Sequence, residues 1–294
     1  MHNCNLKFKV HNNRMIQKKR FKLEKGVLTV LGICALIVFS FLYYIYNITP
    51  YHIVTETDTI ELNSSPKDSL RVVLVSDFHL KQGFPAQMLE GIVDQINEAN
   101  PDVVVFAGDL YDNYDNYHDD EKVIQELSRI DAPYGKLAVW GNRDYGGGAE
   151  NHYLDILDES GFTLLQNSNW YIPLDNGKTV LFTGMDDALL GHPVLNRDTQ
   201  IYDADCSIMV LHEPDEYEQY VKEEYDLALA GHSHGGQILL TPDGPAMEGF
   251  GSQYRKGLYD FTLSKLFVTS GIGTTHLSAR LNVDPVISVL DLKF

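Results

Sequence analysis

The sequence predicts an α/β fold preceded by one N-terminal transmembrane helix. From Leu70 onward, short continuous apolar runs alternate with amphipathic stretches, a pattern typical of buried strands and the helices that cover them. Upstream, residues 27–46 form an uncharged segment that is long enough to cross a bilayer. We therefore divide the chain into a basic tail (1–26), a transmembrane segment (27–46), a linker (47–69) and an α/β domain (70–294).

The N-terminal region is typical of a signal anchor. Tyr43, Tyr44 and Tyr46 cluster at the far end of the apolar segment, where amphipathic rings favour the membrane interface. The following NITPYHIV offers no small-residue cleavage site, so we favour an anchor over a cleaved signal peptide or a core helix. The preceding tail contains one acidic residue, Glu24, and eight basic ones: Lys7, Lys9, Arg14, Lys18, Lys19, Arg20, Lys22 and Lys25.

This charge pattern predicts a topology and excludes one class of partner. By the positive-inside rule, the protein lies in the cell membrane as a single-pass protein, with its N-terminus in the cytosol and its large domain on the outer face. The whole chain carries a net charge of −18, and because the tail is basic, the remainder is more acidic still. An acidic domain repels phosphate backbones, so we expect no nucleic-acid partner. Residues 47–69 include the polar, turn-prone ELNSSPKDS and are predicted to be a linker.

Five predicted strands end in residues that can bind a metal ion or a phosphate. Amphipathic stretches at 86–100, 122–130, 153–160 and 215–225 separate several of them. Ligands of α/β sheets collect beyond the carboxyl ends of strands, so we expect one shared site there. The strands and the polar residues after them are Val72–Val75 with Asp77 and His79, Val103–Phe106 with Asp109, Leu137–Trp140 with Asn142, Arg143 and Asp144, Ile208–Leu211 with His212, and Leu227–Ala230 with His232 and His234.

Two of these loops carry pairs of potential ligands at a spacing of i and i+2. In extended backbone, such side chains leave the same face, so His232 and His234 should point at one spot, as should Asp77 and His79. Crowded imidazoles disfavour protonation and favour a shared metal ion. The stretch AGHSHGGQ alone is equally compatible with a surface turn, but ligands filling five successive strand ends indicate a metal centre.

The ordered motifs DFH, GD, GNRD, LHEPD and GHSHGGQ resemble those of the calcineurin-like metallophosphoesterases, from about Leu70 to the C-terminus. The segment from Gly249 to Val283 is similar to the membrane-associated bacterial branch. The resemblance implies an αββα sandwich of two packed mixed sheets and two divalent metal ions, whether manganese, iron or zinc. It assigns one ion to Asp77, His79, Asp109 and His234, and the other to Asp109, Asn142, His212 and His232.

The resemblance also implies the chemistry. A hydroxide shared between the ions, bridged by Asp109, would attack phosphorus in line while the ions neutralise charge. Arg143 stands where the family usually has histidine, and the same Gly-Asn-Arg-Asp motif occurs in UDP-2,3-diacylglucosamine hydrolases. Arginine is a poor general acid but binds phosphate oxygens well, so we expect Asn142 and Arg143 to act on the substrate. Asp112 is a candidate partner for the metal ligands, and Arg280 is expected at the surface.

We expect a membrane-anchored phosphoesterase that hydrolyses a phosphodiester or pyrophosphate. A lipid-linked substrate is preferred because the anchor raises the local concentration of membrane lipids. A soluble nucleotide or phosphomonoester is the first alternative. The second is a catalytically inactive membrane-tethered scaffold, against which the complete ligand set argues. Metal-dependent amide hydrolysis ranks lower because the ordered spacing matches phosphoesterases and no metalloprotease motif is present.

Overall fold

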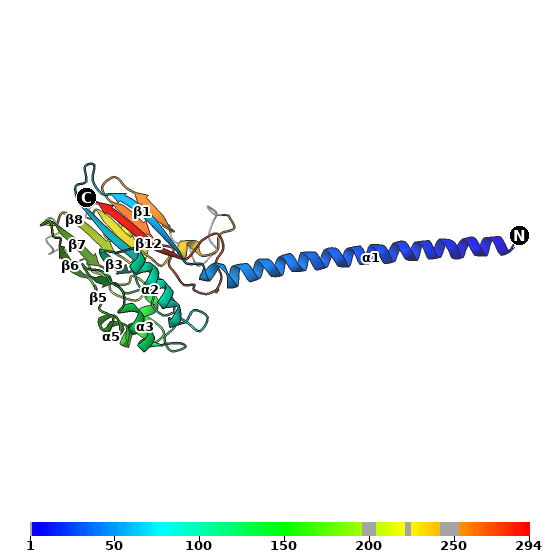
Figure 1. Ribbon diagram of the computed structural model, residues 1–294, viewed down its shortest axis with the longest axis horizontal. Helices are drawn as coiled ribbons and strands as arrows, with labels where there is room; N and C mark the ends of the chain where they lie inside the picture. Colours follow the sequence, from blue (N-terminus) through cyan, green and yellow to red (C-terminus); the bar gives the residue numbers. More distant parts are fainter. Residues whose placement is uncertain (1, 196–203, 221–224, 242–252) are drawn as a thin grey trace. The chain divides into compact units, whose positions relative to one another are not determined.

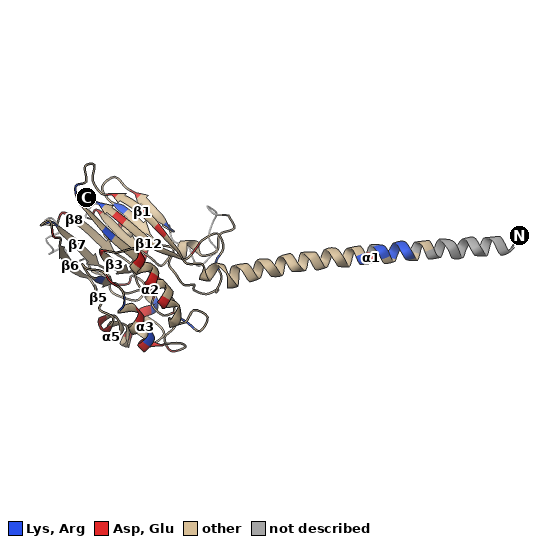
Figure 2. Ribbon diagram, viewed as in Figure 1, with Lys and Arg blue, Asp and Glu red and all other residues tan. Residues whose placement is uncertain are grey.

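The computed structural model describes residues 2–195, 204–220, 225–241 and 253–294. These residues form two compact units, Met1–Ile48 and Thr49–Phe294. The first unit is one helix, α1 (His2–Asn47), shown in blue in Figure 1. In the described part of the chain, it is the one helix that is long and apolar enough to cross a membrane. Figure 2 shows its basic band and the scattered acidic residues of the second unit.

The described residues of the second unit form two mixed sheets, each of six strands, as the family resemblance implied. The first has the order β1-β12-β2-β3-β4-β5 and the second β10-β11-β9-β8-β7-β6. Strands β2 to β5 are parallel, as are β7, β8 and β9 with β11. The bounds are β1 Val54–Glu61, β2 Ser69–Val75, β3 Val103–Phe106, β4 Lys136–Ala138, β5 Thr163–Leu164, β6 Ser168–Pro173, β7 Thr179–Gly184, β8 Cys206–Val210, β9 Leu227–Ala230, β10 Gly257–Asp260, β11 Lys265–Val268 and β12 Val286–Lys293.

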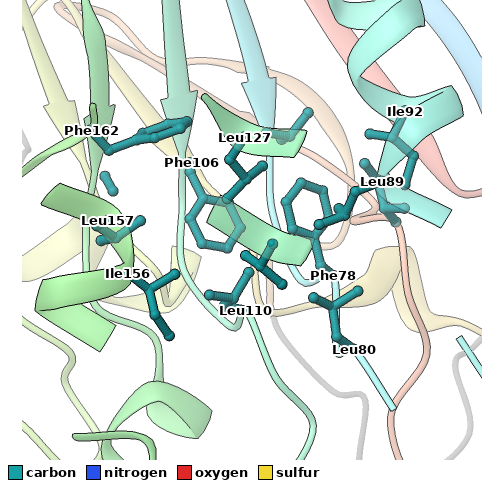
Figure 3. Packing of buried hydrophobic residues seen from close by; sticks show 14 of the residues in the cluster. Phe78, Leu80, Leu89, Ile92, Phe106, Leu110, Leu127, Ile156, Leu157 and Phe162 are labelled. Carbon is teal, nitrogen blue, oxygen red and sulfur yellow. The ribbon is translucent and has the colours of Figure 1, made fainter. Parts of the chain in front are cut away.

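Alternation along β2 shows how the layers form, because successive side chains leave opposite faces of a strand. Val73 and Val75 pack in a cluster with three helices, α2 (Leu89–Glu98), α3 (Asp120–Leu127) and α5 (Tyr153–Glu159). Figure 3 shows part of this helix-facing cluster, in which the stacked rings of Phe78 and Phe106 lie between side chains of the helices. The helices therefore cover the outer face of the first sheet.

The opposite face of β2 packs against the second sheet. Val72 and Leu74 share a buried cluster with Phe182 of β7, Ile208 of β8 and Leu229 of β9. The outer face of the second sheet has a thinner cover, in which Tyr217 of the short helix α6 (Tyr217–Tyr220) is fully buried. The order of layers is therefore helix, sheet, sheet and short helix with loops, which confirms the sandwich.

Part of the predicted linker belongs to the folded unit. Residues 54–61 form β1, which pairs in parallel with β12 at the edge of the first sheet. Only Ile60 of this strand is buried, so its sequence carries little apolar signal. The predicted helix at 215–225 is also shorter, with a 3₁₀ turn at Pro214–Glu216 followed by α6, and residues 221–224 lie outside the described part.

Candidate active site

The five predicted polar loops meet at one end of the sandwich. Three follow β2, β3 and β4 of the first sheet, and two follow β8 and β9 of the second. Because these strands are parallel within each sheet, their carboxyl ends share an edge, and the packed sheets bring both edges together. Side chains from both sheets consequently form one buried cluster.

One half of the cluster contains Asp77, His79 and His234. The Nε2 atoms of the two histidines lie 3.0 Å apart. Asp77 Oδ1 lies 3.6 Å from His79 Nε2 and 3.4 Å from His234 Nε2. All three side chains are almost fully buried, so this is a closed group of one carboxylate and two imidazoles.

The other half contains His212 and His232, and Asp109 joins the two halves. His212 Nε2 lies 3.2 Å from His232 Nδ1. Asp109 Oδ2 lies 3.4 Å from His79 Nε2 in the first half and 3.5 Å from His212 Nε2 in the second. A single carboxylate oxygen thus faces both halves.

The backbone at the site is not extended as predicted. Five of the site residues have left-handed backbone, with φ of 55° at Asp77, 45° at His79, 64° at Asp109, 64° at His232 and 50° at His234. L-residues with side chains rarely adopt this conformation, and it costs roughly 1 kcal/mol per residue. The prediction that His232 and His234 point at one spot is wrong, because His232 contacts His212 and His234 contacts His79.

Glycine permits the close approach of the loops that follow β3 and β4. A Cβ atom on Gly141 would lie 2.4 Å from Asp109 Oδ1 and 2.9 Å from His212 Cε1. Gly108 has φ of 89°, and a Cβ there would lie 2.5 Å from the amide nitrogen of Gly141. The glycines that precede Asp109 and Asn142 in the sequence are therefore required for packing.

The carboxylates of the site are held in their charged form by the histidines. Burial favours the neutral acid at Asp77, but His234, His79 and His212 lower its pKa. Burial likewise opposes ionisation of Asp109, and His212 and His79 lower its pKa. The cluster consequently carries two buried negative charges that need cationic partners.

The histidines divide into two charge states, one of each in each half. Burial opposes the charge on His79, but the nearby carboxylates of Asp112, Asp77 and Asp109 raise its pKa to about 9. Asp109 similarly raises the pKa of His212 despite burial. Burial, reinforced by a neighbouring imidazolium, lowers the pKa of His232 and His234. Without metal, each half therefore holds one imidazolium and one neutral imidazole.

Contacts with groups outside the cluster orient two of its histidines. His212 Nδ1 lies 2.6 Å from the carbonyl oxygen of Ala107, which places a proton on Nδ1 and directs Nε2 toward Asp109. His79 Nδ1 lies 3.4 Å from Asp112 Oδ1, the partner proposed for Asp112 from its sequence position. Such carbonyl and carboxylate contacts are typical of metal-binding histidines.

A cavity of about 360 Å³ opens onto the cluster. Asn142 and Arg143, in the short helix α4 (Asn142–Tyr145), contribute to its wall. The amide nitrogen of Arg143 donates to Asp109 Oδ1 at 2.7 Å, and its Nη2 donates to Thr275 Oγ1 at 3.2 Å. Among the described residues, the Arg143 guanidinium has no ion-pair partner, so it can bind an anion in the cavity.

The sequence analysis assigned no role to Asp144 or Glu213 and placed Arg280 at the surface. Asp144 accepts three backbone N–H bonds beneath the site, and Glu213 lines the cavity next to His212 and His232. Burial raises the pKa of Glu213 to about 8. Arg280, expected at the surface, is fully buried and donates to main-chain carbonyls. The only available signals were the positions of Asp144 and Glu213 beside predicted ligands.

The donor set fits divalent metal ions. Within the part of the chain that the structure describes, three overlapping groups of side chains could hold an ion: Asp77 with His79 and His234, Asp77 with Asp109 and His212, and His212 with Glu213 and His232. Asp77 Oδ1 is buried and has no hydrogen-bond partner in the described part of the chain. A buried carboxylate oxygen facing imidazole nitrogens is stabilised by a cation, and mixed nitrogen and oxygen donors suit manganese, iron or zinc.

This fold and cluster define a metal-dependent hydrolase. Residues 70–236 match the family model of the calcineurin-like phosphoesterases, and the chain belongs to that family. It is a metal-dependent phosphoesterase.

Curated relatives agree with this assignment. The uncharacterized metallophosphoesterase YkuE of Bacillus subtilis is 33% identical over 95% of this chain and 99% of its own length. Phosphodiesterase YaeI of Escherichia coli is 28% identical over 78% of this chain and 83% of its own. A Danio rerio transmembrane protein with a metallophosphoesterase domain is 29% identical over 77% of this chain and 54% of its own.

Proposed function

We propose that the protein is a membrane-anchored, two-metal phosphoesterase that cleaves a lipid-linked phosphodiester or pyrophosphate on the outer face of the cell membrane. The observation that carries the two-metal assignment is the position of Asp109 Oδ2, which faces His79 on one side and His212 on the other. Asp77, His79 and His234 would complete one site with Asp109. His212, His232 and Asn142 would complete the other.

The residues of the chain would hold the substrate and the ions in fixed positions. Bound cations would supply Lewis acidity, lowering the pKa of the attacking water and offsetting charge on the phosphate. Arg143 would bind phosphate oxygens with its guanidinium fork, which Thr275 orients in the cavity wall. Because arginine stays protonated, the leaving group must be fairly acidic or receive its proton from water. A pyrophosphate or an activated diester meets this condition.

The proposed topology follows from the basic band on α1. Lys18, Lys19, Arg20, Lys22 and Lys25 precede the apolar segment, and the catalytic unit follows it. On this arrangement, protease added to intact cells or spheroplasts should degrade the catalytic unit and leave an epitope on the N-terminal tail protected. Protection of the catalytic unit would contradict it.

Metal analysis of the full-length protein in detergent tests the two-metal centre. We expect two equivalents of divalent metal per chain, and a loss of at least one equivalent in Asp109→Asn. Asp58→Asn, an exposed carboxylate of β1, should bind metal as the wild type does. A single equivalent that survives Asp109→Asn would contradict the proposal.

Substrate assays test the lipid preference separately. Full-length protein should hydrolyse a polyprenyl pyrophosphate in mixed micelles, and chelation or His232→Ala should abolish this activity. Turnover of nucleotides or phosphomonoesters, with none of lipid-linked esters, would favour the alternative substrate class and retain the enzyme assignment.

A further inference from the structure

The first residues of the catalytic unit are bonded to loops at the active-site end of the sandwich. Thr49 Oγ1 donates to the carbonyl oxygen of Arg280 at 2.6 Å. The hydroxyl of Tyr51 donates to the carbonyl oxygen of Gly83 at 2.8 Å. The apolar segment of α1 ends at Tyr46, and three residues of chain span at most about 10 Å. Where Tyr46 lies at a membrane interface, Thr49 and the loop bonded to it must lie close to that interface.

The loop that accepts the bond from Thr49 also lines the cavity. Thr275 and His276, a few residues before Arg280, contribute to the cavity wall. The Gln237 side-chain amide donates to the carbonyl oxygen of Thr275 at 3.1 Å and to that of Leu277 at 2.8 Å. Residues 274–281 are therefore bonded to the segment that follows His234.

Backbone hydrogen bonds extend the contact between these two segments toward Leu240. The backbone N–H of Leu281 donates to the carbonyl oxygen of Gln237 at 3.0 Å. The backbone N–H of Leu239 donates to the carbonyl oxygen of Leu281 at 2.9 Å. The entry of the chain, the loop at 274–281 and the segment at 237–241 thus form one hydrogen-bonded surface beside the mouth of the cavity.

Three large side chains with apolar character are exposed on this surface. Leu240 is 77% exposed, Tyr51 40% and Leu277 39%. A single exposed leucine is ordinary in a soluble protein, but these three belong to the hydrogen-bonded segments that begin where the chain enters the catalytic unit. We call Tyr51, Leu240 and Leu277 the apolar rim.

We propose that the apolar rim inserts into the boundary between lipid headgroups and acyl chains, so that the mouth of the cavity faces the bilayer. This inference rests on the proposed function, since it requires α1 to be a membrane anchor. Chain continuity selects a lipid surface rather than a protein as the occupant, because the short connection from Tyr46 keeps the rim within reach of the interface. Leucine gains free energy on leaving water, and tyrosine favours the interface itself. The enzyme would then take its phosphoester directly from the membrane.

Fluorescent labelling of the full-length protein in phosphatidylcholine vesicles tests the insertion. In a background with Cys4, Cys34 and Cys206 replaced by serine, Leu240→Cys and Leu277→Cys would each carry an environment-sensitive fluorophore. The matched control is Leu263→Cys, which is 66% exposed. Leu263 precedes Lys265, which pairs with Leu227 at the start of β9, so it lies at the opposite end of the sheet from the site.

We expect blue-shifted emission that brominated acyl chains quench at positions 240 and 277, with neither effect at 263. Emission at 240 and 277 that matches the control would overturn the inference. A shift that appears without lipid and grows with protein concentration would also overturn it, because it would show contact between copies.

An activity assay separates failure of this inference from failure of the proposed function. The variant Leu240→Asp/Leu277→Asp should hydrolyse the water-soluble diester bis(p-nitrophenyl) phosphate as the wild type does. Its hydrolysis of a polyprenyl pyrophosphate in vesicles should fall about tenfold, equivalent to about 1.4 kcal/mol. Equal hydrolysis of the vesicle substrate by both proteins would reject the docking surface. A wild type inactive on every ester would reject the proposed function instead.

Discussion

Asp144 Oδ2 accepts a hydrogen bond from the amide of Asp109 at 2.7 Å. The same oxygen accepts from the amide of Gly141 at 2.9 Å, and Oδ1 accepts from the amide of Leu110 at 2.9 Å. Asp144 therefore ties the loop after β3 to the loop after β4. Burial and the charge of Asp109 raise the pKa of Asp144 to about 7, against the effect of the three N–H donors.

Replacing Asp144 with asparagine should weaken metal binding. The NH₂ group of asparagine would replace one of the two carboxylate oxygens and cannot accept a hydrogen bond. At least one buried backbone N–H would then lack a partner, at a cost of about 1–3 kcal/mol. We expect at least tenfold lower metal affinity by calorimetry. Asp102→Asn is the matched control, since Asp102 Oδ2 also accepts a backbone bond, from Arg71 at 2.7 Å, but lies before β3 and away from the site. Equal metal affinity in Asp144→Asn and wild type would contradict this role.

Removing the guanidinium of Arg143 should impair turnover without removing metal. Arg143→Ala loses a charged hydrogen-bonding group that faces the cavity, so kcat/KM should fall roughly 10–100-fold. Arg143→Lys should recover part of that loss, because lysine keeps the charge but not the fork. Metal content measured alongside should stay at the wild-type level. Full activity of Arg143→Lys on every ester tested would reject the phosphate clamp.

A methyl group at Gly141 should displace Asp109. In Gly141→Ala, the new carbon would need to occupy space 2.4 Å from Asp109 Oδ1 and 2.6 Å from its amide nitrogen. A displacement of about 1 Å at the site can cost about 100-fold in rate. The control Gly146→Ala is in the same loop, where the nearest atom lies 3.5 Å away, and should retain activity. Equal kcat in the two variants would show that the position of Asp109 does not depend on the absence of a side chain at Gly141.

Metal binding should strengthen as pH rises toward 9. His79 has a pKa raised to about 9 in the metal-free protein, so it is protonated at neutral pH and must lose that proton to bind a metal ion. Calorimetry should show proton release at pH 7 and apparent affinity that increases up to about pH 9. In the metal-free protein, the contacts that raise the pKa of His79 also stabilise the folded state. This stabilisation is complete below about pH 6.5, the pKa of histidine in the unfolded chain, and is lost as pH rises through 9. Affinity that does not change over this range would contradict the assigned charge state.

Arg280 should stabilise the loop that carries Thr275 and His276. Its Nη2 donates to the carbonyl oxygens of Ser270, Gly271 and Gly273 at 2.7–3.0 Å, and burial lowers its pKa to about 10. Arg280→Met leaves these buried acceptors unpaired and should cost about 3 kcal/mol in the free energy of unfolding. Denaturant titration measures this, with Arg280→Lys expected to lose less. An unchanged midpoint in Arg280→Met would show that water replaces these bonds.

The sequence predicted the elements that carry the site better than those at the sheet edges. Val103–Phe106 and Leu227–Ala230 have the predicted bounds, because both strands are buried on two faces and read as continuous apolar runs. The edge strand β1 is mostly exposed, and its polar composition resembles that of a loop. In the edge strand β6, only Ile172 is buried. Burial of Arg280 depends on carbonyl groups that tertiary structure alone brings together.

The left-handed backbone at five site residues has a consequence for how this protein would evolve. Glycine adopts that conformation more readily than aspartate or histidine does, so replacing any of these five with glycine would relieve roughly 1 kcal/mol of strain while discarding a functional group. Thermal robustness and catalysis thus oppose each other at these positions. A laboratory selection for heat resistance that ignored turnover should therefore erase the reactive centre early, and inactive descendants should accumulate glycine there.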